Sequence, residues 1–262
     1  MSTLNIAVIQ SELSWHDAPA NRDRFAERIS SLDASCDLIV LPEMFTTGFS
    51  MDAPGQAESM DGPSMQWLAD TSAKAGAAIC GSLIISDTGH YYNRYILMRP
   101  DGSFEHYDKR HLFRLAGEGE HYSAGFAFPV ISLNDWRIRP MVCYDLRFPL
   151  WSRRHKDADY DLLIYVANWP SARHHAWETL LRARAIENQC YLAGVNRVGV
   201  DGNDLPYSGG SAIVDYLGHD IVNLGANSDT ALAALDKAAL VRFRDRFPFD
   251  LDADSFTLHT GE

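Results

Sequence analysis

Cysteine is scarce in this sequence, and its spacing excludes the usual structural roles of that residue. The chain has 262 residues, and its four cysteines include no Cys-x-x-Cys pair. Cysteines so few and so scattered predict neither a disulfide scaffold nor a structural zinc site. In a reducing compartment each would remain available as a thiol. The four are Cys36, Cys80, Cys143 and Cys190.

Basic residues and long apolar runs are also lacking. The formal net charge of −12 argues against nucleic acids and anionic membranes as main partners. The chain passes from Met1 directly into a strand-like segment, without the basic region, apolar run and cleavage site of a signal peptide. No stretch has the length and apolar character of a membrane span. We therefore expect a cytoplasmic protein with no membrane or nucleic-acid partner.

No linker divides the chain. Segments rich in proline, glycine or serine, low-complexity runs and short repeats are all absent. A single domain of this size buries roughly 70–75% of its unfolded surface, so it needs no disulfide or metal to hold it together. We expect one domain over residues 1–262, in which residues 248–262 form an acidic C-terminal tail.

Strand-like and helix-like segments alternate along the chain. Short apolar runs such as 37–41 and 161–167 are typical of central strands that are covered on both faces. Because hairpins and helical crossovers are mixed, the pattern predicts an α/β sandwich with a mixed sheet in each layer, and it allows a coarse symmetry of two halves. Further strands are predicted at 4–10, 77–86, 91–98, 103–107, 129–133, 136–142, 190–195, 209–216, 220–224 and 230–235, and helices at 21–32, 62–75, 173–188, 237–246 and from Leu150 onward.

Three reactive side chains stand just beyond predicted strands. Glu43, Lys109 and Cys143 each lie within two residues of the C-terminal end of a strand. Open α/β sheets place ligands at such ends. A carboxylate, an ammonium and a thiol are the minimal set for nucleophilic acyl transfer, as base, oxyanion partner and nucleophile. The three strand ends therefore predict one active site.

Each of these side chains also has a simpler interpretation. Cys143 lies on a turn between a predicted strand and a predicted helix, where the helix N-terminus would favour its thiolate, but most free cysteines are small buried hydrophobes. Glu43 could be a solvated acid in a loop. Lys109 could belong to a charged surface cluster over residues 108–111.

Other ionisable residues near the motifs leave further alternatives open. His111 and His121 could act as bases for the cysteine in a thiol–histidine arrangement, although no supporting asparagine points to either. Arg147 is expected to pair with Asp145 in a structural contact rather than to bind a substrate. Residues 108–128 have no steady period, and a loop this long in a compact domain is usually functional or mobile.

Three motifs follow one another around the reactive residues: Leu41-Pro42-Glu43, YDKRHLF at 107–113 and VCYDLRFP at 142–149. In this order they resemble the carbon–nitrogen hydrolase (nitrilase) superfamily, and the likeness extends from about Leu4 to Phe247. Three further segments are Asn168-Trp169-Pro170, residues 182–189 and Asn196-Arg197-Val198-Gly199. They are similar to the bacterial ω-amidase branch, which acts on 2-oxoglutaramate and 2-oxosuccinamate.

The resemblance implies a fold and a set of catalytic residues. The implied fold is a four-layer αββα sandwich with two mixed sheets. The implied catalytic triad is Glu43, Lys109 and Cys143. It also implies a homodimer that forms through helices, a small-molecule amide substrate, and no metal or organic cofactor.

A second glutamate is implied in the loop between the lysine and the cysteine. Glu118 and Glu120 are both candidates, and Glu118 is preferred for its spacing to Gly125. The chain departs from the family at Leu150, where many members have an acid. That change removes a charge at a helix start and touches none of the triad.

The implied reaction is hydrolysis of a small aliphatic amide through a thioester, with release of ammonia. A free cysteine has a pKa of about 8.5, so near neutral pH the thiol is expected to pass its proton to Glu43 as it attacks. Lys109 and the backbone N–H of Tyr144 are expected to stabilise the oxyanion. Glu118 would orient the lysine or bind the substrate amide.

The implied substrate is the ω-amide of a 2-oxo dicarboxylic acid, whose free carboxylate needs a cation. Arg173 is the first candidate for that role, and Arg114 and Arg147 are others. Polar or aromatic contacts to the substrate are expected from Tyr144, Trp169 and His174.

Two other kinds of function stay open. A nitrilase, an N-carbamoylase or another aliphatic amidase would use the same triad. In a non-catalytic thiol or redox-sensing module, Cys143 would be oxidised or alkylated without turnover. Such a module would not need Glu43 and Lys109 at matching strand ends.

Overall fold

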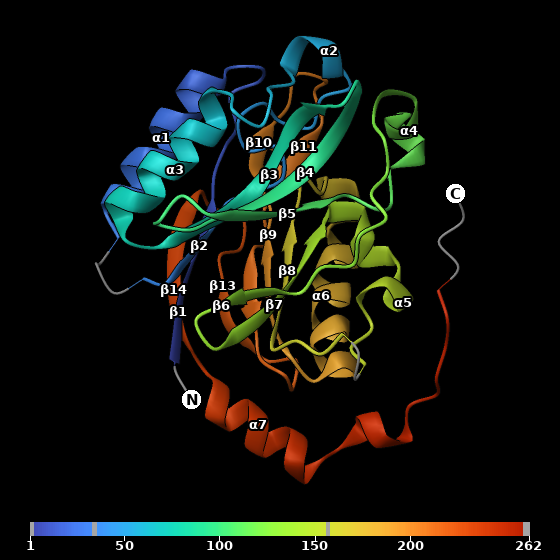
Figure 1. Ribbon diagram of the computed structural model, residues 1–262. Coiled ribbons are helices and arrows are strands. Elements are labelled where there is room, and N and C mark those ends of the chain that lie inside the picture. The colour runs from blue at the N-terminus through green and yellow to red at the C-terminus, as the bar shows by residue number, and fades with distance from the viewer. Residues whose placement is uncertain (1–2, 33–35, 156–157, 259–262) are drawn as a thin grey trace.

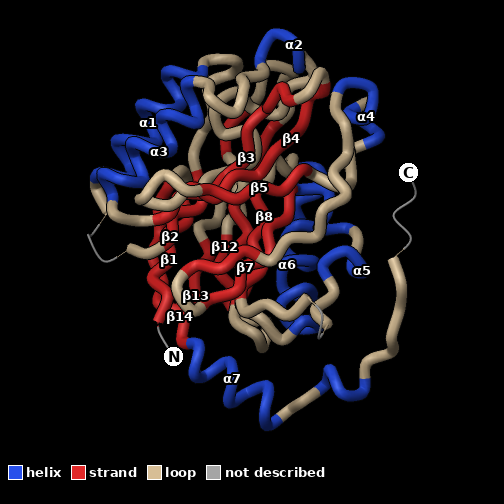
Figure 2. The backbone as a smooth tube through the Cα atoms, in the orientation of Figure 1, coloured by secondary structure: helices blue, strands red, loops and turns tan. Residues whose placement is uncertain are grey.

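Two six-stranded sheets lie face to face, with helices on the outer side of each (Figures 1 and 2). The structure is a computed structural model, and it describes residues 3–32, 36–155 and 158–258. Helices α1 (Ala18–Ser30) and α3 (Pro63–Ala75) cover the first sheet, and α6 (His174–Asn188) covers the second. The predicted four-layer αββα sandwich is therefore confirmed.

The first sheet has the strand order β14-β1-β2-β3-β4-β5. Strands β1, β2 and β3 run parallel. The other pairs are antiparallel: β14 with β1, β4 with β3, and β5 with β4. Strand β5 thus points the same way as β2. The strands span Thr3–Gln10 (β1), Leu38–Val40 (β2), Ala78–Asp87 (β3), His90–Met98 (β4), Phe104–Asp108 (β5) and Asp229–Asp236 (β14).

The second sheet has the order β13-β12-β9-β8-β7-β6 and the same plan. Its three parallel strands are β7, β8 and β9, and the other three pair antiparallel. Each half of the chain thus supplies three parallel strands, although β14 returns to the first sheet. The strands span Ile131–Leu133 (β6), Trp136–Val142 (β7), Leu162–Val166 (β8), Tyr191–Val195 (β9), Ala212–Val214 (β12) and Asp220–Asn223 (β13).

Side-chain alternation along the central strands builds two separate cores. In β1, Ile6 and Val8 pack into the core between the sheets, whereas Ala7 and Ile9 pack under α1 and α3. Successive residues of a strand point to opposite faces, so a strand that is buried on both sides must be apolar throughout. This explains the continuous apolar runs in the sequence.

Several elements differ from the sequence-based expectation. The helix expected from Leu150 is a single turn, α5 (Pro149–Ser152), because the backbone becomes extended at Arg153. The helix expected at 237–246 is present, and Asp236 caps its N-terminus, since the Asp236 side chain accepts a hydrogen bond from Ala239 N at 3.0 Å. The remaining short elements are α2 (Ala53–Gln56), α4 (Glu118–His121), the ribbon β10 (Val198–Val200) with β11 (Pro206–Ser208), and 3₁₀ turns at Arg114–Ala116, Cys143–Arg147, Ser171–Arg173 and Phe249–Asp252. Helices α2 and α4 and the ribbon of β10 with β11 were not predicted.

The C-terminal part leaves the sandwich after β14. Helix α7 (Lys237–Arg246) and the segment behind it run around the base of the molecule (Figure 1). The expected tail over residues 248–262 is described only as far as Leu258, which packs at the edge of the central core. No helix within the described ranges is long and apolar enough to span a membrane.

Candidate active site

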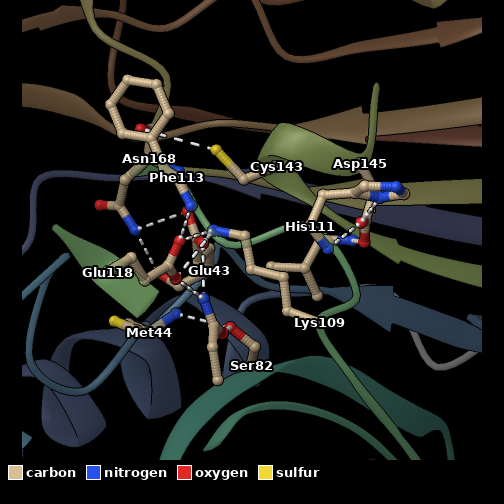
Figure 3. A network of polar contacts seen from close by, with 12 residues as sticks. Glu43, Met44, Ser82, Lys109, His111, Phe113, Glu118, Cys143, Asp145 and Asn168 are labelled. Atoms are coloured by element: carbon tan, nitrogen blue, oxygen red, sulfur yellow. Dashed lines mark hydrogen bonds and ion pairs between the residues drawn. The ribbon is translucent and has the colours of Figure 1, made fainter. Parts of the chain in front are cut away.

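The three predicted reactive residues meet at one edge of the sandwich. Glu43 follows β2, Lys109 follows β5 and Cys143 follows β7. Strands β2 and β5 have the same direction, so their C-terminal ends lie at the same edge of the first sheet. Figure 3 shows all three side chains in one cluster. All three are buried, with residue exposures of 0%, 1% and 8%.

Cys143 occupies a sharp turn with an unusual backbone conformation. Its φ is +45°, in the left-handed region that side-chain-bearing residues rarely adopt. Such a residue stores about 1–3 kcal/mol of strain, and strained residues cluster at active sites. The turn directs the sulfur toward the end of the neighbouring strand β8, where Sγ lies 3.8 Å from the carbonyl oxygen of Asn168 (Figure 3).

The ammonium of Lys109 lies between two carboxylates. Its Nζ is 3.0 Å from Glu43 Oε1, and 3.0 and 2.9 Å from the two oxygens of Glu118. Burial alone would lower the pKa of Lys109, but the charges of Glu118 and Glu43 more than offset this and raise it above its usual value. Lys109 is therefore a permanent cation in the site.

Glu118 reaches this cluster from the long loop after β5. Burial raises the pKa of its carboxyl, and the charge of Glu43 adds to that effect, while the Lys109 ammonium opposes it. Phe113 N donates to Oε2 of Glu118 at 2.5 Å, which fixes the carboxylate from the loop side. The other candidate, Glu120, is exposed. Of the two, only Glu118 lies beside Lys109.

The loop that carries Glu118 is closed by a glycine. Gly125 N donates to the carbonyl oxygen of Lys109 at 3.0 Å. A Cβ at this position would lie 2.2 Å from the carbonyl oxygen of Asp108, so no larger residue fits. The loop therefore both leaves and returns to the end of β5, next to Lys109.

Glu43 is held by two asparagines that the sequence analysis did not assign to the site. Asn93 Nδ2 donates to Oε1 at 2.7 Å, and the backbone N–H of Asn168 donates to Oε2 at 2.7 Å. Asn168 Nδ2 also donates to the main-chain oxygen of Glu43 at 2.7 Å. Each oxygen of Glu43 therefore has a fixed donor in addition to Lys109.

The sequence contains a signal for both asparagines. Asn93 is a buried polar residue of β4, and Ser82 Oγ donates to its Oδ1 at 2.8 Å. Asn168 lies just beyond the C-terminal end of β8, so it follows a strand end as Glu43 and Lys109 do. A polar residue in such a place needs a buried partner.

The environment of Cys143 stabilises the thiol and not the thiolate. Burial raises the pKa of Cys143 well above its usual value, and the charge of Glu43 raises it further. The expected help from a helix N-terminus is wrong, because the turn after Cys143 is a short 3₁₀ segment and α5 has only four residues. A proton acceptor is therefore needed for Cys143 to act as a nucleophile.

A cavity of about 300 Å³ opens above the sulfur. Of the predicted substrate-binding residues, Tyr144, Trp169 and Arg173 line it, as does Arg147. His174 does not line the cavity, because its ring contacts Ser208 Oγ at 3.1 Å and Glu178 at 3.3 Å. The remaining lining residues are Phe49, Met51, Lys109, Phe113, Ala116, Cys143, Asn168, Pro170, Asp201, Asn203, Leu205 and Tyr207.

Two guanidinium groups of this cavity rest on aromatic rings. The Cζ of Arg147 lies 5.2 Å from the ring centre of Trp169, and that of Arg173 lies 5.0 Å from Phe113. Neither forms an ion pair within the part of the chain that the structure describes. The expected pairing of Arg147 with Asp145 is wrong. Arg114, the third candidate cation, lines a separate cavity.

The two histidines proposed as bases are engaged elsewhere or exposed. His111 Nδ1 lies 2.8 Å from a carboxylate oxygen of Asp145, a residue that is fully buried. His121 is at the exposed end of α4. Among the described residues, no group of three or more histidine, cysteine or acidic side chains could hold a metal ion, and all four cysteines are free.

Comparison with known proteins gives consistent matches over the whole chain. The profile of the carbon-nitrogen hydrolase family matches residues 5–245. The chain is 48% identical, over 98% of its own length and 100% of the relative's, to the omega-amidase YafV of Yersinia enterocolitica. It is 32% identical to the 2-oxoglutaramate amidase of Bacillus subtilis, over 93% of this chain and 95% of that protein.

A solved structure shows the same fold. It is the crystal structure of XC1258 from Xanthomonas campestris, a CN-hydrolase superfamily protein with an arsenic adduct in its active site. The TM-score is 0.96 at 46% sequence identity, and the match covers 99% of this chain and 100% of that one.

Proposed function

This chain belongs to the carbon–nitrogen hydrolase family and is an amide-hydrolysing enzyme, and on that basis we propose that it removes ammonia from the ω-amide of a 2-oxo dicarboxylic acid. Substrates of this kind are 2-oxoglutaramate and 2-oxosuccinamate. The observation that carries the proposal is the buried cluster of Glu43, Lys109 and Cys143, of which Lys109 and Cys143 line a cavity together with two arginines that form no ion pair with any described residue.

The first half of the reaction forms a thioester. Cys143 gives its proton to Glu43 while the sulfur attacks the amide carbon, and the carbonyl oxygen becomes an oxyanion. The Lys109 ammonium and the backbone N–H of Tyr144 stabilise that oxyanion, and one such donor is typically worth about 3–4 kcal/mol. Glu43 then protonates the nitrogen, the C–N bond breaks, and ammonia leaves.

The second half returns the enzyme to its starting state. Glu43 takes a proton from water, whose oxygen attacks the thioester carbon. The C–S bond breaks, the sulfur receives the proton from Glu43, and the carboxylic acid leaves. Because the pKa of Cys143 is raised, the sulfur holds this proton again at the end of the cycle.

Glu118 keeps the ammonium in place for both halves. It binds Lys109 through both oxygens from the side of the loop, and Glu43 binds the same ammonium from the other side. The carboxylate that moves protons is thus separate from the one that orients the lysine. In this respect Glu118 is a positioning residue in the proposed mechanism.

The substrate carboxylate has two candidate partners, Arg147 and Arg173. Both line the cavity and lack a protein counter-ion within the described residues. Asp201 is the acidic residue among those that line the cavity. Its carboxylate is hydrogen-bonded nearby in the chain, since it accepts from Asn203 N at 2.8 Å and from Tyr207 Oη at 2.9 Å. The cavity therefore suits a 2-oxo acid better than an amino acid, whose ammonium would face two cations.

A substrate panel tests the proposed function. Ammonia release is measured with 2-oxoglutaramate, 2-oxosuccinamate, glutamine, simple aliphatic nitriles and N-carbamoyl amino acids, for the wild type and for Cys143→Ala. We expect the 2-oxo acid amides to give the highest kcat/KM, and the variant to be folded and inactive. Preference for a nitrile or carbamoyl substrate, or near-full activity of the variant, would overturn the proposal.

We further propose that the protein is a cytoplasmic homodimer whose single domain covers the whole chain. An apolar contact surface is offered by Ile186 on α6 and Leu217 in the adjacent turn, which are 47% and 49% exposed. Gly218, the residue after Leu217, lies against the Ile186 side chain, because a Cβ at Gly218 would be 2.6 Å from it. Sedimentation of the wild type should give twice the chain mass, and Ile186→Glu should shift it toward the monomer; a monomeric wild type would contradict this.

A further inference from the structure

We propose that Asp145 is a positioning residue, which together with His111 fixes the distance between the lysine and the nucleophile of the proposed reaction. The inference rests on the roles proposed above for Lys109 and Cys143. The architecture explains why this distance has to be fixed by a specific contact. Lys109 follows a strand of the first sheet and Cys143 a strand of the second, so their separation depends on how the two sheets are joined at this edge.

Asp145 is fully buried and its carboxylate accepts four hydrogen bonds. Oδ1 accepts from the backbone N–H of His111 at 3.0 Å and from its Nδ1 at 2.8 Å (Figure 3). Oδ2 accepts from Tyr107 Oη at 2.8 Å and from the backbone N–H of Val142 at 3.0 Å. Two of these donors are backbone groups, so the carboxylate holds main chain as well as side chains.

These four contacts bracket both reactive residues. Tyr107 and His111 stand two residues before and two residues after Lys109. Val142 immediately precedes Cys143, and Asp145 itself follows it by two residues. One carboxylate thus ties the segment on each side of the lysine to the segment on each side of the nucleophile.

Aromatic packing completes the joint between the segments. The His111 ring stacks on Phe148, with 3.7 Å between the ring centres and an angle of 8° between their planes. Tyr107 Oη, besides donating to Asp145, accepts hydrogen bonds from Trp151 Nε1 at 2.8 Å and Arg110 N at 3.1 Å. The residues after Lys109 are therefore packed against the residues after Cys143.

The hydrogen-bond pattern defines the chemical state of the pair. All four contacts direct a donor at Asp145, so a carboxylate with four acceptor positions satisfies them and His111 must carry its proton on Nδ1. In Asp145→Asn, an amide NH₂ group would replace one oxygen, and its donors would face the two donors that this oxygen now accepts from. At position 111, an asparagine could still place a side-chain N–H near Asp145, whereas an alanine could not.

The test compares His111→Ala with His111→Asn, because this site is partly exposed and less critical for folding than the buried Asp145. His219→Ala is the matched control, since His219 also contacts an aspartate, at 3.4 Å, but on the surface. For each protein, kcat and KM for 2-oxoglutaramate are measured per folded molecule, along with Tm and the rate at which iodoacetamide alkylates Cys143.

We expect His111→Ala to lower kcat about tenfold to a hundredfold with little change in KM, since a displacement near 1 Å is enough for such a loss. His111→Asn should recover most of that loss, and His219→Ala should match the wild type. Asp145→Asn should reproduce the alanine variant if it folds. Alkylation should also change in His111→Ala, because it reports the surroundings of the sulfur without substrate.

Two results would overturn the inference. In one, His111→Ala has a lower Tm but keeps kcat within about twofold of the wild type. Such a change in kcat is too small for lost positioning. In the other, His111→Asn is as impaired as His111→Ala, so that the ring and not the hydrogen bond matters. A wild type inactive on every amide would instead refute the proposed function, and the alkylation rates would still decide whether the Cys143 turn depends on His111.

Discussion

Glu118 binds the ammonium of Lys109 with both of its carboxylate oxygens, at 3.0 and 2.9 Å, and neither side chain is exposed to solvent. In the proposed mechanism, this contact separates two tasks that one acid could not perform together. Glu43 exchanges protons during the proposed reaction, so its contact with the lysine must change. Glu118 keeps its contact in both halves of that reaction, which leaves the lysine in place while Glu43 transfers protons.

Replacing Glu118 by glutamine should lower kcat by about a hundredfold or more, as loss of an oxyanion partner does. Glutamine offers Lys109 one oxygen, and its amide N–H groups would face an ammonium that can only donate. Steady-state kinetics with 2-oxoglutaramate measures the effect. Glu120→Gln is the matched control because Glu120 is exposed two residues away, and it should be fully active. Equal activity of the two variants would contradict the role of Glu118.

Replacing Lys109 by methionine should destabilise the fold as well as remove activity. The change leaves two buried carboxylates without their cation, which typically costs about 3–5 kcal/mol. Urea unfolding at pH 7 measures this loss. The pKa of Glu118 is already raised by burial, and without Lys109 it must rise further. A carboxyl with a raised pKa stabilises the fold at low pH and loses that contribution as the pH rises. The loss of unfolding free energy in Lys109→Met should therefore become smaller as the pH is lowered from 7 to 5.

A double variant checks the cause of that loss. Lys109→Met combined with Glu118→Gln removes one cation and one of its two carboxylates. It should be more stable at pH 7 than Lys109→Met alone, although still inactive. If the double variant is the less stable of the two, packing and not charge explains the effect of the lysine.

Replacing Arg173 or Arg147 by alanine should raise KM for 2-oxoglutaramate. A hydrogen bond to a charged group is worth about 1.5–3 kcal/mol, which corresponds to roughly a tenfold to hundredfold change. An uncharged amide such as butyramide should show little change, because it has no carboxylate to bind. Arg114→Ala is the control, since Arg114 lies outside this cavity. An unchanged KM for 2-oxoglutaramate in Arg173→Ala would remove that residue from the site.

Stability should fall steeply above pH 9 because of thiols outside the active site. Burial raises the pKa of Cys80 and Cys190 to about 12 each. A raised pKa in the folded state means that stabilisation is complete below the unfolded value, near 8.5, and is lost as the pH rises toward 12. Each thiol should contribute a slope of about 1.4 kcal/mol per pH unit in that window.

Urea midpoints between pH 8 and pH 10.5 measure this slope. Cys190→Ala should be less stable at pH 8 but show a shallower decline with pH. Ile213→Val, which trims a buried side chain without a titrating group, should lower stability equally at every pH. Parallel curves for the wild type and Cys190→Ala would show that this thiol does not titrate in the window.

The sequence predicted the parts of the site that depend on strand ends. Glu43, Lys109 and Cys143 each follow an apolar run, and parallel strands bring such ends together whatever the loops do. The fold class followed from the same runs. The choice of Glu118 over Glu120 came from spacing within a recognised motif, and the structure places Glu118 beside the lysine.

Contacts between distant segments were not predictable in the same way. Arg147 was expected to pair with Asp145 because they are neighbours in sequence, yet Asp145 turns inward to His111 and Tyr107. His174 was assigned to the substrate because it follows Arg173. At the start of α6 the two side chains diverge, and His174 faces Ser208. Neighbours in a helix point in different directions, so adjacency in sequence gives no shared surface.

The N-terminal strand β1 pairs along its whole length with β14, from Thr3 opposite Asp236 to Gln10 opposite Asp229. During synthesis on the ribosome, one edge of β1 therefore stays unpaired until more than two hundred further residues have been made. An open strand edge is a site for wrong pairing and aggregation, and contacts this distant in sequence slow folding. Glu43, Lys109, Glu118 and Cys143 all precede β14, so a nascent chain can contain every proposed catalytic group while the first sheet still lacks its last strand.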